Sequence, residues 1–173
     1  MASDQEEFLR ATMGGVDLVY NLSRRLTNGR QDAEDLVQDT FLQAFRAWRD
    51  HRRPKRTEPW LATICLNLAR SRYRARGRRP FEVSFEEWMV EARSGSDPES
   101  SAIGELEREE LYRALRELPQ EQRVAITLVD LSGLSTYEAA EVMGSPRGTV
   151  LSRLHRGRRA LARLLGDRIE EVI

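Results

Sequence analysis

The chain has 173 residues, of which 40% are hydrophobic and 32% charged, and its formal net charge is zero. This length allows one ordinary domain or two small ones, and the composition is typical of a globular, helix-rich protein. No apolar run approaches the roughly 18 residues of a membrane span, and the polar, acidic segment 1–10 does not resemble a signal peptide. The lone Cys65 and two scattered histidines, His51 and His155, exclude an internal disulfide and the usual Cys/His zinc site. We therefore expect a cytoplasmic protein with no metal, no cofactor and no membrane contact of its own.

The first part of the chain has the pattern of three helices. Residues 5–27 form the first expected helix, which Gly14-Gly15 weakens near its middle. In residues 32–49 the apolar side chains recur at i, i+3 and i+4, which marks one buried face of a second helix. A similar apolar stripe runs from Leu61 to Ala69 in a third helix. Because no alternating strand pattern occurs, we expect an all-α fold in which these helices share one core.

The zero net charge hides an uneven distribution. Residues 70–81 contain six arginines and no acid, and residues 142–166 contain six more arginines and no acid. Between these basic blocks, residues 82–110 carry ten acids against two arginines. Gly, Pro and Ser interrupt the acidic stretch, so we expect residues 81–104 to be a flexible linker. This linker would join two small helical domains, residues 1–80 and 105–173.

The C-terminal domain contains residues that typically start and end the two helices of a helix-turn-helix. Ser135 and Glu138 fit a capping box at the start of a short helix, which Gly144 ends. Ser145 is expected to cap the next helix, with Pro146 in its first position. A short helix, a tight turn and a longer arginine-rich helix are the parts of a DNA-binding helix-turn-helix.

The second helix of this motif enters the major groove with its N-terminal residues near the base edges. Val150 and Leu154 are expected to face the core, and the backbone N–H groups near Arg147 to hold a phosphate. The alternative is an arginine-rich, solvated helix in a bundle. The residues expected to point outward, toward DNA, are Arg147, Gly148, Thr149, Ser152, Arg153, His155 and Arg156.

Several motifs occur in the order found in one protein family. Leu118–Arg123, Gly133–Glu141 and Gly148–Arg158 closely resemble region 4 of the extracytoplasmic-function (ECF) subfamily of bacterial RNA polymerase sigma factors. Asp32–Phe41 resembles the core-binding helix of region 2, and Pro59–Arg70 with Gly77–Pro80 resembles the helix that recognises the −10 element and the segment after it. The resemblance implies an alternative sigma factor, responsive to stress or another signal, that directs RNA polymerase core (β and β′ subunits) to specific promoters. It leaves open whether an anti-sigma factor binds the chain.

In the family, the region 2 helix docks on the clamp coiled coil of the β′ subunit. The resemblance assigns this contact to Asp35, Gln38 and Asp39. Their spacing independently places all three on one polar face, opposite the apolar stripe. An ordinary solvated face is the alternative.

The resemblance and the spacing also define a −10 surface. Its candidates form a stripe opposite Leu61 and Leu68, with an amide for base edges and arginines for phosphates. Trp60 could instead belong to the core. The basic loop 50–58, which captures a flipped base in the family, fits single-strand binding or a solvated hinge equally well. The −10 candidates are Trp60, Thr63, Asn67, Arg70 and Arg74.

The sequence shows no catalytic constellation, so we expect a transcription factor and not an enzyme. Two other classes stay open. A helix-turn-helix repressor or activator working as a dimer would not need the acidic face at Asp35, and a helical adaptor would not need a basic recognition helix.

Overall fold

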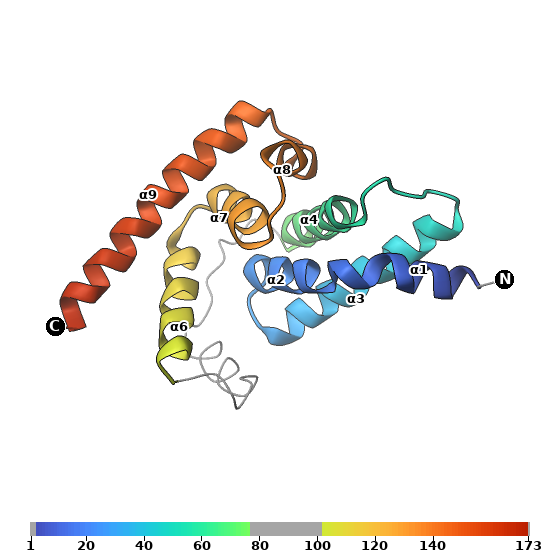
Figure 1. Ribbon diagram of the computed structural model, residues 1–173. Coiled ribbons are helices and arrows are strands. Elements are labelled where there is room, and N and C mark those ends of the chain that lie inside the picture. Colours follow the sequence, from blue (N-terminus) through green and yellow to red (C-terminus); the bar gives the residue numbers. More distant parts are fainter. Residues whose placement is uncertain (1–2, 77–101, 173) are drawn as a thin grey trace.

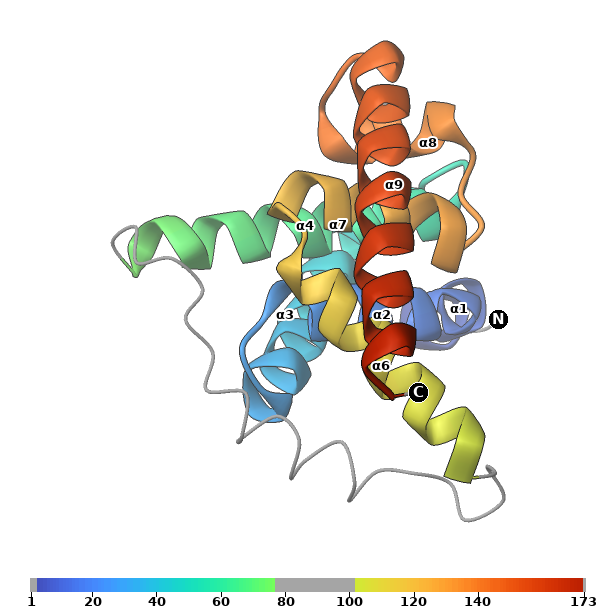
Figure 2. The ribbon, with the colours of Figure 1, turned by 90° about the vertical axis from the view of Figure 1, so that its left-hand side faces the viewer.

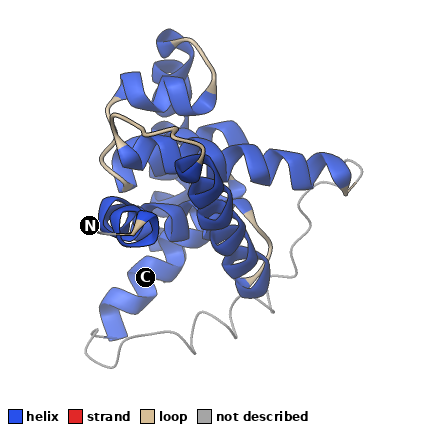
Figure 3. Ribbon diagram, turned by 90° about the vertical axis from the view of Figure 1, so that its right-hand side faces the viewer, coloured by secondary structure: helices blue, strands red, loops and turns tan. Residues whose placement is uncertain are grey.

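The computed structural model describes residues 3–76 and 102–172 of the chain. These residues form helices joined by short loops, with no strand among them (Figure 3), which confirms the all-α prediction. The expected linker, residues 81–104, lies outside the described residues except for its last three, which already belong to a helix.

The N-terminal unit consists of α1 (Asp4–Thr12), the 3-10 turn η1 (Met13–Gly15), α2 (Val16–Leu26), α3 (Arg30–Arg49) and α4 (Thr57–Ala75). The interruption expected at Gly14-Gly15 is present, because η1 separates α1 from α2 at these glycines. Ser3 and Glu6 form a capping box that starts α1.

One core holds these helices together. Leu22, Leu36, Leu61 and Leu66, from α2, α3 and α4, are completely buried. Full burial of such a side chain contributes about 1.5–3 kcal/mol. Cys65 lies in the same core, with its sulfur 3.4 Å from the Ser23 hydroxyl. Burial raises the pKa of the Cys65 thiol, so this group stays neutral and acts as a small apolar side chain.

The C-terminal unit consists of α6 (Ala102–Glu117), α7 (Gln120–Ile126), the π-helical turn η2 (Thr127–Leu131), α8 (Thr136–Met143) and α9 (Arg147–Val172). Its core includes Leu115, Leu128, Val150 and Leu154, all at most 1% exposed. The inward direction predicted for Val150 and Leu154 is confirmed. Gly157 lets α9 cross α7 closely, since a Cβ there would lie 2.7 Å from Ile126 Cδ1.

The two units pack directly against each other, which the sequence did not predict. Figures 1 and 2 show α7 and α8 beside α4, whereas α9 lies along the outside of the C-terminal unit. At α2, the Arg25 guanidinium lies over the Tyr112 ring, 5.2 Å from its centroid. Arg123 donates hydrogen bonds to the carbonyls of Arg25, Arg116 and Leu118 at 2.9–3.3 Å. Arg123 of α7 thus bonds to the carbonyl groups at the end of α6 and also to the N-terminal unit.

Among the described residues, no helix is long and apolar enough to cross a bilayer. The same residues contain no group of three His, Cys, Asp or Glu side chains that could hold a metal ion.

Candidate nucleic-acid and polymerase interfaces

The turn between α8 and α9 begins with the predicted cap. The Ser135 hydroxyl accepts a hydrogen bond from the Glu138 backbone N–H at 3.2 Å, and the Glu138 carboxylate accepts one from the Ser135 N–H at 2.8 Å. Gly144 ends α8 with a φ of 60°, in the left-handed region where a side chain would be strained. The capping box and the glycine stop are therefore confirmed.

The start of α9 differs from the prediction by one residue. The helix begins at Arg147, and the Pro146 carbonyl accepts hydrogen bonds from the Thr149 and Val150 N–H groups at 2.9 and 3.2 Å. The Ser145 hydroxyl donates to the Met143 carbonyl at 3.5 Å and accepts from Arg153 at 3.0 Å. The prediction of Ser145 as the cap is thus wrong, because its hydroxyl joins the preceding helix to a side chain two turns away.

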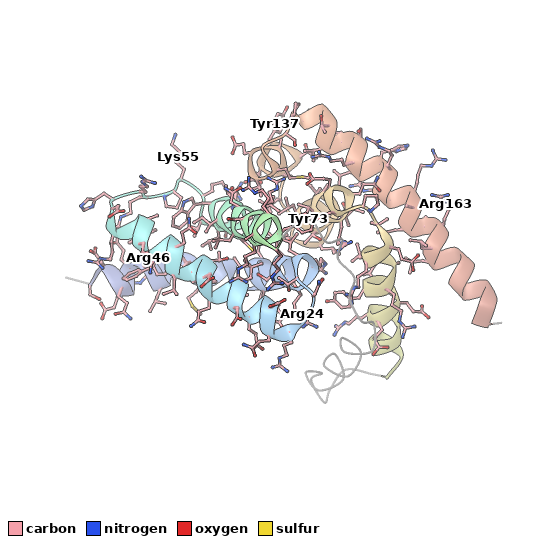
Figure 4. All side chains as sticks on the ribbon, turned by 180° about the vertical axis from the view of Figure 1, so that it is seen from behind. Arg24, Arg46, Lys55, Tyr73, Tyr137 and Arg163 are labelled. Atoms are coloured by element: carbon pink, nitrogen blue, oxygen red, sulfur yellow. The ribbon has the colours of Figure 1, made fainter. Side chains whose placement is uncertain are left out.

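The outer face of α9 is exposed over most of its predicted positions. Arg147, Gly148, Ser152, His155 and Arg156 are exposed, and Thr149 is half-buried. The Arg156 guanidinium donates to the Ser152 hydroxyl at 2.9 Å, so the two side chains lie together on this face. Further along α9, Arg163 points away from the body of the protein (Figure 4).

Helix α8 adds an aromatic residue to this face that the sequence reasoning missed. Tyr137 is 66% exposed, and the Arg147 guanidinium stacks 4.2 Å from its ring centroid. Arg147 also donates to the Thr136 hydroxyl at 2.9 Å. These contacts orient Arg147 before any ligand binds. The signal available in the sequence was an aromatic residue, Tyr137, two positions after the capping Ser135.

Arg153 does not point outward with the other candidates. Its side chain is only 21% exposed, and its guanidinium lies 3.1 Å from a carboxylate oxygen of Glu121 on α7. Together with its hydrogen bond to Ser145, this ion pair holds Arg153 against α7 and the turn. The structure therefore separates Arg153 from the exposed face of α9.

The candidates on α4 also divide into exposed and half-buried residues. Asn67 and Arg74 are exposed, whereas Trp60, Thr63 and Arg70 are half-buried. The Trp60 ring lies 6.5 Å from Trp48 of the core on one side. On its other side, Trp60 lines a cavity of about 270 Å³ between the two units, together with Lys55, Arg56, Pro59, Thr63, Glu138 and Glu141. Trp60 therefore belongs to both the core edge and the surface.

The basic loop before α4 is anchored at Arg53, which the sequence reasoning did not single out. The Arg53 guanidinium lies 4.0 Å from the Trp48 ring centroid. It also forms ion pairs with Asp4 at 3.5 Å and Glu7 at 3.2 Å on α1. Lys55 extends from the same loop into solvent (Figure 4). The loop is thus held at one point and leaves a cation exposed beside it.

Glu138 of α8 faces the N-terminal unit as a charged group. It forms an ion pair with Arg56, and only 14% of its side chain is exposed. The backbone hydrogen bond from Ser135 is the main cause that holds the pKa of the Glu138 carboxyl below its ordinary value, and Arg56 adds to it. The carboxylate therefore stays ionised at neutral pH.

The predicted polar face of α3 is exposed as a unit. Asp35, Gln38 and Asp39 all point to solvent. Arg72 of α4 forms an ion pair with Asp39 and donates to the Asp35 backbone carbonyl at 3.2 Å. The sequence did not predict this role of Arg72. Arg70, Arg72 and Arg74 recur at every second position of α4, and this spacing does not show which of them reaches α3.

Comparisons with known proteins agree with this arrangement. The family model described as Sigma-70 region 2 matches residues 16–79, and the model described as Sigma-70, region 4 matches residues 108–161. The chain is 37% identical over 155 residues to the ECF RNA polymerase sigma factor SigE of Mycolicibacterium smegmatis, covering 90% of this chain but 60% of that relative. It is 38% identical over 149 residues to the ECF RNA polymerase sigma-E factor of Escherichia coli K12, covering 81% of this chain and 76% of the relative.

Two solved structures share the fold over most of their length. The sigma factor RpoE of Bartonella quintana, solved with the anti-sigma factor NepR, gives a TM-score of 0.73 at 30% identity, covering 92% of this chain and 97% of RpoE. CnrH, solved with the cytosolic domain of CnrY, gives a TM-score of 0.67 at 28% identity, covering 94% of this chain and 90% of CnrH. With both family models in order and relatives of this identity, the chain belongs to the ECF family of RNA polymerase sigma factors, which act in transcription initiation.

Proposed function

We propose that this chain directs RNA polymerase core to specific promoters in the cytoplasm, as an alternative sigma factor that responds to stress or another signal. The observation that carries the proposal is the combination of two exposed surfaces in one chain. One is the outer face of α9, and the other is the acidic face of α3. A free repressor needs only the first of these surfaces, and a polymerase-binding adaptor needs only the second.

In this proposal α9 binds the −35 element as duplex DNA. Arg147, Ser152 and Arg156 are exposed near the start of α9, the part of a recognition helix that meets base edges. Arginine in this position pairs with guanine or with phosphate. The full set proposed for −35 contact is Arg147, Gly148, Thr149, Ser152, Arg153, His155 and Arg156, of which Arg153 would first have to leave its ion pair with Glu121.

The stripe on α4 binds the −10 element as a separated strand. Bases that leave the stack can be captured by aromatic and amide side chains, and this capture favours the melted state. Melting therefore needs binding energy and no bond chemistry. The residues proposed for this contact are Trp60, Thr63, Asn67, Arg70 and Arg74.

The α3 face binds the β′ subunit through Asp35, Gln38 and Asp39. Residues 1–80 and 105–173 would then act as two domains joined by residues 81–104. A chain of 24 residues can span about 80 Å, and promoter elements about two helical turns apart are separated by about 70 Å. Both domains can therefore engage one promoter together.

The test is transcription in vitro with core polymerase and this chain on genomic DNA, after which the start sites are mapped. We expect a discrete set of starts that share upstream elements and are absent without the chain. Co-purification with core polymerase separates this proposal from a free repressor. Starts that do not depend on the chain, together with no retention by core polymerase, would refute it.

An anti-sigma factor is a second partner that we propose, because RpoE, which this chain resembles, was solved with one. Affinity capture of the chain from its source cells, before and after stress, would test it. The expected result is an inhibitor released from the chain when its promoters become active.

A further inference from the structure

Leu151 is an exposed apolar residue in the proposed −35 surface. It is 42% exposed, whereas its neighbours Val150 and Leu154 are at most 1% exposed and belong to the core of the C-terminal unit. The −35 candidates predicted from the sequence did not include Leu151. Because this leucine lies outside the core that fixes α9, packing within the protein does not explain an apolar side chain at this position.

Helical spacing places Leu151 in the middle of the exposed face of α9. Arg147 and Gly148 precede it by four and three residues, and His155 follows it by four residues, so these residues share one face. All of them are exposed. In Figures 1 and 2 the first turns of α9 lie beside α8 and clear of α1–α3. Leu151 thus belongs to the end of α9 that meets base edges in a helix-turn-helix.

The two long basic side chains nearest to this position are held by other partners. The Arg147 guanidinium stacks on the Tyr137 ring of α8. The Arg156 guanidinium donates to the carbonyl and to the hydroxyl of Ser152. Long basic side chains often cover apolar surface with their methylene groups. Here both are engaged elsewhere, and Leu151 stays exposed.

Gly148 keeps the turn before Leu151 free of side-chain bulk. A Cβ added at Gly148 would meet no side chain of the described residues within 4 Å, so packing inside the protein does not require a glycine here. The missing side chain does let another molecule approach the backbone of α9 closely. The surface around Leu151 is therefore open as well as apolar.

A thymine methyl group is the partner that fits this position. The surrounding basic residues attract the phosphates of duplex DNA. In the major groove, thymine alone among the four bases presents a methyl group, and apolar side chains contact it. Leu151 has no polar side-chain atom with which to pair with another base edge or a phosphate. A single exposed leucine needs no explanation on an ordinary surface, but this one lies between basic side chains on the face that meets the bases.

We propose that Leu151 recognises a thymine of the −35 element through its 5-methyl group. Resting on the proposed function, in which α9 binds that element as duplex DNA, this contact selects T·A at one position over the pairs that lack the methyl group. Arg147 and His155, one turn away on either side, contact neighbouring phosphates or bases. The −35 element of this chain thus contains a thymine whose methyl group contributes directly to affinity.

The test uses the full-length chain and duplexes selected for binding to it from a randomised pool, with and without core polymerase. Each thymine of the selected sequence is replaced in turn by uracil, which removes only the methyl group. Fluorescence anisotropy gives the affinity for each duplex. Leu151→Ala removes the proposed contact and keeps a residue of high helix propensity. Leu131→Ala is the matched control, because Leu131 is 40% exposed but lies on η2.

We expect one of the uracil substitutions to weaken binding of the wild type about fourfold, the effect of losing one buried methyl group. The same substitution should change the affinity of Leu151→Ala by less than about 1.5-fold, whereas Leu131→Ala should keep the full effect. A C·G pair at that position provides a second comparison. Replacing its cytosine by 5-methylcytosine should tighten binding of the wild type about fourfold and leave Leu151→Ala unchanged.

A selected sequence without a thymine, or one in which every thymine tolerates uracil, would show that Leu151 does not recognise a methyl group. Equal sensitivity of Leu151→Ala and the wild type would show the same, and in each case duplex binding itself would stand. Failure to select any duplex, even with core polymerase, would also remove the −35 contact from the proposed function. The start-site mapping decides separately whether the chain directs transcription.

Discussion

Helices α4 and α9 are both basic, amphipathic and proposed to bind promoter DNA, yet they differ in what covers them. The polar stripe of α4 faces α7 and α8, so three of its five candidates are half-buried. Helix α9 lies on the outside of the molecule (Figure 1), and of its candidates Arg153 is the one held by an ion pair to α7. Similar charge and periodicity therefore lead to different accessibility.

The comparison shows that the accessibility of a helix face depends on how the whole chain packs and not on that helix alone. A helix-turn-helix orders its own reading face, because the turn at Gly144 and the core contacts of Val150 fix α9 against α8. Within its own unit, the stripe on α4 is packed at Trp60, whose ring lies 6.5 Å from Trp48. The neighbouring unit packs against the same stripe.

The largest effect is expected on the acidic face of α3, which the contact between α4 and the C-terminal unit leaves exposed. Asp35→Arg should abolish retention of core polymerase, because a reversed charge in such an interface costs several kcal/mol. The fold should persist, since Asp35 is exposed on α3. Pull-down of core polymerase by the folded variant measures it, with Glu34→Arg as the neighbouring control. Normal retention by Asp35→Arg would show that this face is merely solvated.

Equal truncations in the two cores sharpen the comparison of the units. Leu61→Ala and Leu154→Ala each remove a side chain that is at most 1% exposed, and each should cost about 2–5 kcal/mol of unfolding free energy. Because Leu154 lies in the core of the C-terminal unit, Leu154→Ala should weaken duplex binding and should loosen that unit more than the α1–α4 core. Denaturant unfolding and hydrogen exchange of each unit provide the measurement. An equal loss of protection in both units in either variant would contradict this expectation.

The turn that orders α9 can be weakened at a single residue. Gly144→Ala forces a Cβ into the left-handed region and should cost about 1–2 kcal/mol. Gly166→Ala is the matched control, because Gly166 lies in α9 with nothing within 4 Å of its added Cβ. That control should be neutral or stabilising, by up to about 1 kcal/mol. Thermal unfolding of both variants decides whether the positive φ at Gly144 is required.

The exposed face of α9 has a measurable electrostatic signature. Arg156→Ala should lower the slope of log affinity against log salt by about 0.9, if Arg156 neutralises one phosphate of the −35 duplex. If Arg156 pairs with a guanine instead, discrimination at one base pair should fall by about 1–3 kcal/mol. Titrations of mapped promoter fragments at several salt concentrations separate these results. An unchanged affinity at every salt concentration would remove Arg156 from the interface.

The smallest effect concerns the acid dependence of α8. The folded-state pKa of Glu138 is lowered, so its carboxylate stabilises the fold above the unfolded-state pKa. This contribution is lost as the pH falls through the lowered folded-state value. Glu138→Gln should therefore show a flatter decline of thermal stability on acidification than the wild type. Identical declines for the two proteins would assign the acid sensitivity to other carboxylates.

The sequence by itself determined the local elements and the family. Apolar spacing defined α3 and α4, the Ser135–Glu138 pair and Gly144 defined the helix-turn-helix, and ordered motifs identified regions 2 and 4. These features depend on neighbouring residues, on backbone conformation and on one buried face per helix. They are therefore visible along the chain without knowledge of its tertiary contacts.

Only the tertiary structure decided which charged residues meet. Arg153 and Ser152 look alike as outward candidates, yet Arg153 reaches Glu121 of another helix and Ser152 stays exposed. Arg70 and Arg72 are two residues apart, and one meets Met143 while the other meets Asp39. Long, flexible, charged side chains take partners that lie far away in sequence, and no periodic pattern records those partners. The covering of α4 by α8 results from such long-range contacts.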